Sequence, residues 1–276
     1  MIAEKSFRRD VETENIFLSN QHQEALVRLE YFVRNMYVSL LTGEPGVGKS
    51  TLLRTFIKKL EPSKYCICYI NNSDLTPKTL YTDVLHSMSV APFAFLPMIK
   101  KQFSEVAMDV FKNQNKRIIV FIDNAQSLPI QTLHEIRYML NFQYDSMSPV
   151  SLILIGQPEL FATLRLRTFE PLFYRLSSHY QFKGFNQKQT GEYILHQLSL
   201  SNLNMLFPDD VVAKIWSRSR GLPQLINTIC LHCLIDMEAN SLNLVDNDVL
   251  DRVLINNIKP HAMRGRIQKG VLISVI

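Results

Sequence analysis

The stretch YVSLLTGEPGVGKSTLLRTFIKKL, residues 37–60, decides the fold of this chain. A short β-rich run ends at Gly43, and an amphipathic helical run begins at Lys49. Between them, GEPGVGKS fits the pattern G-x-x-x-x-G-K-[ST] in full. Glycines allow backbone N–H groups to turn inward around phosphates, and the helix N-terminus adds the positive end of its dipole. We therefore predict a phosphate-binding loop between a strand and a helix.

This loop predicts a nucleotide site that also holds a magnesium ion. Lys49 should reach the β- and γ-phosphates of ATP, and the Ser50 hydroxyl should ligate Mg²⁺. A glycine turn with an incidental lysine is the competing interpretation, which the flanking strand and helix disfavour. The predicted nucleotide-binding residues are Gly43, Glu44, Pro45, Gly46, Val47, Gly48, Lys49, Ser50 and Thr51.

The run RIIVFID, residues 117–123, supplies the second half of the predicted site. We predict that its last residue, Asp123, holds the same Mg²⁺ as Ser50, because the loop and the aspartate occur in the order that phosphoryl-transfer sites require. An aspartate that only caps the following turn is the alternative. The next residue is Asn124, whose amide cannot take a proton from water. We place it among the candidate catalytic residues with Lys49 and Asp123.

Apolar strand-like runs alternate with amphipathic helical runs through the first part of the chain. Strands this apolar are typical of parallel sheets that helices cover on both faces. We therefore predict an α/β fold, a doubly wound parallel sheet with a small C-terminal helical lid. The expected strands are 36–43, 65–71, 117–123 and 150–156, and the expected core helices are 18–35, 49–60, 76–88, 98–114 and 129–142.

The strand signals stop near Phe185, and four helical runs follow at 186–201, 208–220, 222–239 and 246–257. This change in pattern predicts the domain boundaries. The N-terminal helix and the nucleotide-binding core should occupy 1–184, and the lid should occupy 185–258. A basic tail, 259–276, carries Arg264, Arg266 and Lys269.

Composition narrows the class of protein. The formal net charge of +5 and the pI near 9.0 permit nucleic-acid binding without requiring it. No window approaches the roughly 18 apolar residues of a membrane span, and the N-terminus lacks the apolar core of a secretory signal, so we expect a cytoplasmic protein without membrane contact. No cysteine pair has a second ligand pair at zinc-site spacing, which favours buried thiols over a metal site. The cysteines are Cys66, Cys68, Cys230 and Cys233.

Several strings resemble the AAA+ ATPases of the group that contains the ExeA/GspA secretion proteins and the transposition regulators TnsC, MuB and IstB/TniB. The resemblance covers residues 15–255, and it implies a P-loop AAA+ core that uses ATP and Mg²⁺. The strings that carry it are ALVRLEYFVRNMYVSLLTGEPGVGKSTLLRTF, FIDNAQSL, LILIGQPEL, YRLSSHYQF and GLPQLINTICLHCL.

The resemblance also implies two further catalytic roles. Gln157 in GQPEL matches the position of sensor 1, a polar side chain near the γ-phosphate. Arg175 in YRLSSHYQF matches the arginine finger, which stabilises transferring charge only when it reaches a neighbouring subunit's nucleotide. A surface arginine before a strand is the alternative for Arg175, and Arg165 and Arg167 are competing candidates for the finger.

Two positions depart from the family pattern. The usual glutamate after the magnesium aspartate is Asn124, and the lid arginine called sensor 2 is Gln224 in GLPQ. Asn124 can still orient a water molecule, and Arg218 or Arg220 can stand in for the lid arginine. Because phosphoryl transfer relies mainly on positioning and electrostatics, we expect an ATPase that binds ATP well and hydrolyses it slowly.

The transposition regulators of this group assemble as rings or helical filaments on duplex DNA. Their DNA contacts come from segments after the second strand, which match Lys78, Lys100 and Lys101 here. Repetition around a homo-oligomer would multiply such phosphate contacts into salt-sensitive binding with little sequence preference. For each lysine alone, a solvated helix face is the alternative.

The secretion ATPases of the same group add a transmembrane helix and a periplasmic peptidoglycan-binding domain, and this chain ends at Ile276 with neither. We therefore expect a TnsC-like regulator of DNA transposition that links a target-selection protein to a transposase. An ExeA/GspA-like secretion ATPase is the alternative. A nucleotide-binding scaffold without hydrolysis is a third class.

Overall fold

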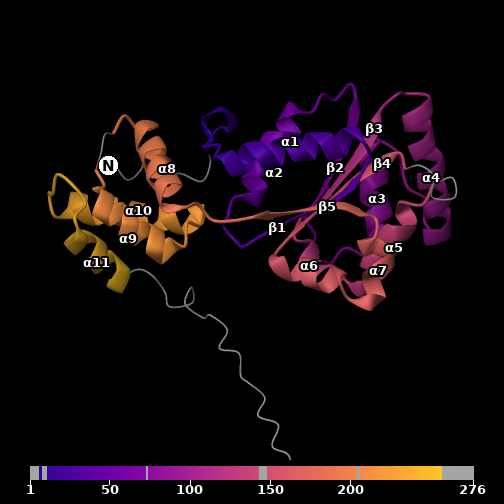
Figure 1. Cartoon of the computed structure of the whole chain (residues 1–276). Helices are drawn as coiled ribbons and strands as arrows, with labels where there is room; N and C mark the ends of the chain where they lie inside the picture. Colours follow the sequence, from indigo (N-terminus) through magenta and orange to yellow (C-terminus); the bar gives the residue numbers. More distant parts are fainter. Residues whose placement is uncertain (1–5, 8–10, 73, 143–147, 204–205, 257–276) are drawn as a thin grey trace, which may run out of the picture.

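The computed structural model describes residues 6, 7, 11–72, 74–142, 148–203 and 206–256 (Figure 1). The predicted basic tail and the last two residues of the predicted lid lie outside the described residues. Within them, no helix is both long enough and apolar enough to cross a bilayer.

Five parallel strands form one sheet in the order β2-β3-β4-β1-β5 (Figure 1). Every residue of the inner strands β1 and β4 is buried, as expected. Burial is only partial in β2, because an edge strand has covering elements on fewer sides. β5, the other edge, is largely polar and was not among the expected apolar strands. The strands are β1 (Val38–Gly43), β2 (Tyr65–Ile70), β3 (Arg117–Ile122), β4 (Val150–Gly156) and β5 (Leu176–Phe182).

Helices cover both faces of this sheet, so the predicted doubly wound α/β fold is confirmed. Ile119 and Phe121 of β3 pack on the face covered by α1 (Asn20–Arg34) and α2 (Lys49–Lys59). Ile118 and Val120 alternate with them and face the remaining helices. Those helices are α3 (Pro77–Ser87), α4 (Leu96–Lys112), α5 (Ile130–Met139), α6 (Pro158–Leu164) and α7 (Glu170–Phe173). Short 3-10 turns precede α1 at η2 (Thr13–Asn15), precede α5 at η3 (Ala125–Ser127) and separate α6 from α7 at η5 (Arg167–Phe169).

A separate bundle of four helices follows the last strand (Figure 1). Its core includes Ile226, Cys230 and Leu234, and the described N-terminal residue Phe7 joins it. The predicted lid helices are therefore present, while the exact domain boundaries stay predictions. The four helices are α8 (Gln187–Ser199), α9 (Asp209–Ser219), α10 (Pro223–Ala239) and α11 (Asn247–Asn256).

The residues at the N-caps of α3 and α1 form different hydrogen bonds. Thr76 caps α3 in a reciprocal capping box with Thr79, and Pro77 opens the helix. Ser19 stands at the N-cap of α1, but its hydroxyl makes no cap hydrogen bond. Ser19 Oγ lies 2.8 Å from His22 Nδ1 instead, so the hydroxyl pairs with a buried ring rather than with the backbone. The short helices α6 and α7 were not expected, because seven and four residues carry too little periodicity.

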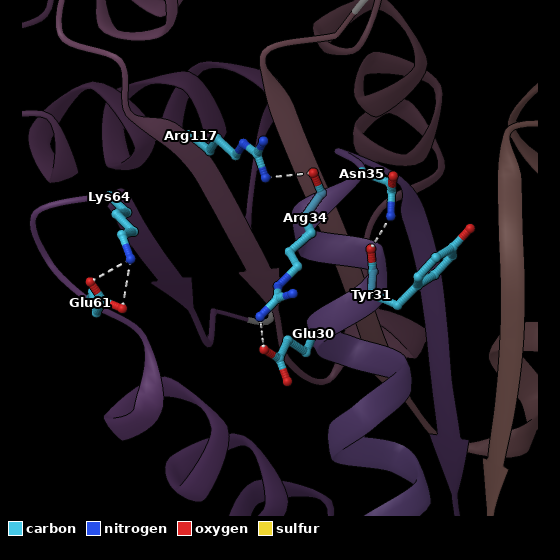
Figure 2. Close-up of polar contacts among 7 residues, drawn as sticks. All are labelled: Glu30, Tyr31, Arg34, Asn35, Glu61, Lys64 and Arg117. Atoms are coloured by element: carbon cyan, nitrogen blue, oxygen red, sulfur yellow. Dashed lines mark hydrogen bonds and ion pairs between the residues drawn. The ribbon is translucent and has the colours of Figure 1, made fainter.

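Polar contacts join elements at the amino-terminal edge of the sheet (Figure 2). Arg117, the first residue of β3, donates from Nη1 to the backbone carbonyl of Arg34 at 2.5 Å. Asn35 donates from Nδ2 to the Tyr31 carbonyl at 2.7 Å. The Glu30–Arg34 pair is exposed and contributes little free energy of folding. The end of α1 is thus held against the start of β3.

A three-residue polar cluster joins α3, α4 and α5. Tyr81 donates its hydroxyl to Glu135 Oε1 at 2.8 Å, and the Lys100 ammonium lies 2.7 Å from Glu135 Oε2. Glu135 is 8% exposed. Lys100 therefore balances a buried carboxylate, which the predicted DNA-contact role did not anticipate.

We expect Lys100→Ala to destabilise the fold, because Glu135 would keep its burial and lose its cation. Lys100 itself is partly exposed, so we expect a loss of only about 1–2 kcal/mol, or roughly 2–6 °C in Tm. Lys101→Ala is the matched control, since its ammonium lies 3.8 Å from an exposed Glu105. Thermal unfolding of both variants checks this; equal Tm values would contradict it.

Candidate functional site

The predicted phosphate loop connects β1 to α2 at the carboxyl edge of the sheet. Gly46 and Gly48 adopt φ values of +79° and +107°, which side-chain-bearing residues rarely tolerate. A Cβ atom on Gly46 would also lie 2.5 Å from Gln224 Oε1 at the start of α10. The loop therefore needs glycine both for its backbone turn and for its contact with the lid.

Lys49 points into the loop. Its Nζ donates to the backbone carbonyls of Gly43 at 2.6 Å and Glu44 at 3.1 Å. Burial lowers the pKa of the Lys49 ammonium, while the carboxylates of Asp123 and Glu44 oppose that shift. A cation at this point, beside the N-terminus of α2, suits a phosphate group.

Asp123 follows β3, is 5% exposed, and accepts hydrogen bonds from three directions. Tyr69 donates its hydroxyl to Oδ2 at 2.7 Å, and the backbone N–H of Asn124 donates to Oδ1 at 2.8 Å. Ser50 Oγ lies 3.5 Å from Oδ2. The structure thus brings the two predicted magnesium ligands together.

These oxygens fit a magnesium ion. Mg²⁺ prefers one or two protein oxygens together with substrate phosphates and water. Ser50 and Asp123 offer a hydroxyl and a carboxylate beside the phosphate loop. A bound Mg²⁺ would neutralise charge that develops on the phosphates.

Asn124 extends from the site edge in the left-handed conformation, with φ +54°. Its Nδ2 donates to Asn71 Oδ1 at 2.8 Å. The Asn124 side-chain oxygen is therefore left as the acceptor for a water molecule. An amide can orient that water but cannot take its proton.

Gln157 stands at the N-cap of α6 and lines the same cleft as the loop. Its backbone N–H donates to Gln126 Oε1 at 3.1 Å. Gln126 therefore links the segment after β3 to the segment after β4. Gln126 belongs to the string FIDNAQSL, and no local pattern in that string predicts its role.

A cleft of about 1160 Å³ lies between the core and the lid. Gln224 lines it, and the Gln224 backbone N–H donates to the Gly46 carbonyl at 3.2 Å. The predicted sensor-2 position is thus beside the phosphate loop, with a neutral side chain. Further lining residues come from the N-terminal segment (Phe7, Val11, Ile16, Phe17, His22), the loop and α2 (Pro45, Lys49, Thr51, Arg54) and the lid (Phe185, Tyr193, Asn227, Leu231).

The three candidate finger arginines lie outside the residues that line this cleft. Arg175 donates from Nη1 to the Arg137 carbonyl at the end of α5, at 3.1 Å. Arg165 stacks on the Phe161 ring at 5.8 Å, and Arg167 is exposed. A finger that serves a neighbouring subunit would not line the cleft of its own chain, so this role stays a prediction.

The lysines predicted to contact DNA are not equivalent. Lys78 and Lys101 are exposed on α3 and α4, whereas Lys100 is engaged by Glu135. All four cysteines are free thiols; three of them are buried, as expected, whereas Cys66 is half-buried. Burial raises the pKa of Cys68 to about 11. Among the described residues no group of three or more histidine, cysteine or acidic side chains forms a metal site.

Comparison with known proteins adds to this geometry. Residues 33–164 match the family model described as an AAA domain. This segment of the chain is therefore similar to an AAA domain. It is 28% identical to general secretion pathway protein A of Aeromonas hydrophila over 99% of this chain, and it spans 50% of that relative. Since it covers only about half of the relative, the length of the chain does not discriminate between the transposition and secretion roles.

Solved structures share the fold at low identity. Cdc6p of Pyrobaculum aerophilum superposes with a TM-score of 0.66 at 14% identity, covering 94% of this chain and 73% of that one. Drosophila ORC bound to DNA superposes with a TM-score of 0.68 at 13% identity, covering 97% of this chain and 68% of that one. RuvB of Thermotoga maritima superposes with a TM-score of 0.56 at 17% identity, covering 90% of this chain and 72% of that one. These likenesses support the AAA+ fold.

We expect Tyr69→Phe to weaken Mg²⁺ binding, because Asp123 would lose the hydroxyl that orients its Oδ2. Removing such a supporting group typically costs about 10–100-fold in metal affinity. Titration of a fluorescent nucleotide at varied Mg²⁺ should show a higher half-saturating concentration of the metal, with unchanged affinity in EDTA.

The control for this test is Tyr81→Phe, which removes another hydroxyl-to-carboxylate hydrogen bond, between two residues that do not line the cleft. It should leave the Mg²⁺ dependence unchanged. The same Mg²⁺ dependence in Tyr69→Phe and the wild type would show that the phenol does not position Asp123.

Proposed function

We propose that this chain is a magnesium-dependent ATPase module related to general secretion pathway protein A. The meeting of Lys49, Ser50 and Asp123 at one cleft is the observation that supports ATP binding most directly. The likeness to the secretion protein extends over 99% of this chain, beyond the AAA domain itself. Nucleotide state would then control contacts with other components of a secretion pathway.

In this proposal the loop residues 43–51 hold the phosphates of ATP, and Lys49 supplies their main fixed positive charge. Ser50 and Asp123 hold Mg²⁺. Asn124 orients the attacking water through its side-chain oxygen, and Gln157 contacts the γ-phosphate from the other side. Hydrolysis is slow for two reasons. Asn124 cannot act as the general base that a glutamate provides at this position, and Gln224 lacks the positive charge of the usual lid arginine.

We expect slow, Mg²⁺-dependent phosphate release that Lys49→Ala abolishes together with ATP binding. Asn124→Glu should raise turnover by at least tenfold. A general base contributes about 10²–10⁴-fold, and we expect the lower part of this range or less because glutamate strains the left-handed backbone at this position. Phosphate release and fluorescent-nucleotide titration measure both effects.

The control for Lys49→Ala is Lys58→Ala, an exposed lysine in the last turn of the same helix. ATP binding that survives Lys49→Ala would remove the loop from the mechanism. If Asn124→Glu binds ATP normally without faster turnover, Asn124 is not at the water-activating position.

A second candidate function is regulation of DNA transposition on duplex DNA. The exposed Lys78 and Lys101 on neighbouring helices favour it, and Drosophila ORC, which shares the fold, was solved bound to DNA. ATP between subunits would be contacted by Arg175 of a neighbour, so nucleotide would control assembly and assembly would control DNA affinity. A transposase and a target-selection protein would be its partners.

Gel-shift assays with ATP, ADP and no nucleotide separate the two functions. The transposition role predicts ATP-dependent, salt-sensitive binding with little sequence preference, weakened by Lys78→Ala with Lys101→Ala and by Arg175→Ala. Lys100 is left intact, because its loss would disturb Glu135. Equal or absent DNA binding in all three states would contradict the transposition role and leave the secretion proposal standing.

A further inference from the structure

His22 is held in one orientation beside the phosphate loop. Its Nδ1 lies 2.8 Å from Ser19 Oγ, and its ring packs edge-to-face on Phe182 at a centroid distance of 4.8 Å. The side chain is 3% exposed. These contacts occupy one nitrogen and one ring face, so the position of the second nitrogen, Nε2, is set by the fold.

Nε2 faces the loop and the cleft. A Cβ atom on Gly48 would lie 3.4 Å from it, which places the ring against the last glycine before Lys49. His22 lines the cleft, and among the described residues Nε2 has no hydrogen-bond partner. A ring nitrogen that lines a cleft and has no protein partner is available to a ligand in that cleft.

The surroundings of His22 indicate which part of a ligand it would meet. On one side lies the phosphate loop. On the other lie aromatic lining residues: Phe185 is 6.1 Å from the His22 ring, and Phe17 packs on Phe185 at 5.6 Å. Aromatic side chains suit a flat base. His22 therefore lies between the part of the cleft that suits phosphates and the part that suits the nucleoside.

The ring is neutral at ordinary pH, because burial lowers the pKa of His22 to about 4. In a neutral imidazole one nitrogen donates and the other accepts. When Ser19 donates to Nδ1, Nε2 carries the proton. The ribose and base of a nucleotide offer acceptor atoms to such a donor.

We propose that His22 binds the nucleoside part of the nucleotide through a hydrogen bond donated by Nε2. This inference rests on the proposed nucleotide function of the cleft and deepens it. The contacts with Ser19 and Phe182 hold the ring in the orientation that this hydrogen bond requires.

Two amide substitutions separate the nitrogens of His22. In His22→Gln the terminal amide reaches the position of Nε2, whereas in His22→Asn it reaches only that of Nδ1. We expect His22→Asn to bind ATP about five- to tenfold more weakly, as for one lost hydrogen bond, and His22→Gln to retain most of the affinity. Equilibrium binding is measured with ATP, 2′-deoxy-ATP and tripolyphosphate as competitors of a fluorescent nucleotide.

The three competitors locate the contact. Tripolyphosphate should bind the wild type and His22→Asn equally, since it lacks a nucleoside. If the ribose 2′-hydroxyl is the acceptor, the effect of His22→Asn should vanish with 2′-deoxy-ATP; if it persists, the acceptor lies elsewhere on the nucleoside. Equal affinities of both variants and the wild type for ATP would overturn the inference. So would an equal loss for tripolyphosphate, which would assign His22 to the shape of the loop.

Failure of the inference remains distinguishable from failure of the proposed function. Lys49→Ala should lose ATP and tripolyphosphate alike. A wild-type chain that binds neither would refute the nucleotide function itself. Thermal unfolding of each variant without nucleotide confirms that the compared proteins are folded.

Discussion

β4 lies between β1 and β3 in the sheet, and this pairing sets the positions of the groups in the cleft. Thr42 of β1 pairs with Gly156 of β4, and Ile122 of β3 pairs with Leu154. The phosphate loop, Asp123 and Gln157 therefore all begin at the carboxyl ends of adjacent strands. A slip of one residue in any pair would turn its side chains to the opposite face of the sheet. The geometry of the site depends on this register.

Charge inside the cleft is balanced by short contacts. Burial would disfavour the Lys49 cation, and the carboxylates of Asp123 and Glu44 offset part of that cost. Asp123 in turn accepts hydrogen bonds from Tyr69 and from the backbone of Asn124. The phenol keeps its proton, because burial and the neighbouring carboxylate raise the pKa of Tyr69 well above its usual value. These contacts therefore preorganise the charged groups of the cleft, as electrostatic catalysis requires.

The lid approaches the loop through a neutral residue. Gln224 makes a backbone hydrogen bond to Gly46, and its side chain lies against that glycine. His22 of α1 reaches Gly48 from the N-terminal side. Three parts of the chain, the N-terminal segment, the core and the lid, therefore meet around a loop of eight residues. A ligand in the cleft would contact all three, so its binding couples their positions.

The sequence by itself determined the features that local patterns encode. The glycine-rich loop, the apolar inner strands, the aspartate after β3 and the four lid helices each follow from residues adjacent in the chain. Only the tertiary structure decided which distant side chains meet. Tyr69 and Asp123 are 54 positions apart, and Lys100 and Glu135 are 35 apart. Neither contact leaves a periodic signal, because each depends on strand register and helix packing. The same reason applies to His22: the sequence predicts a helix over 18–35, but only the packing of α1 against β5 directs the second nitrogen of His22 at the phosphate loop.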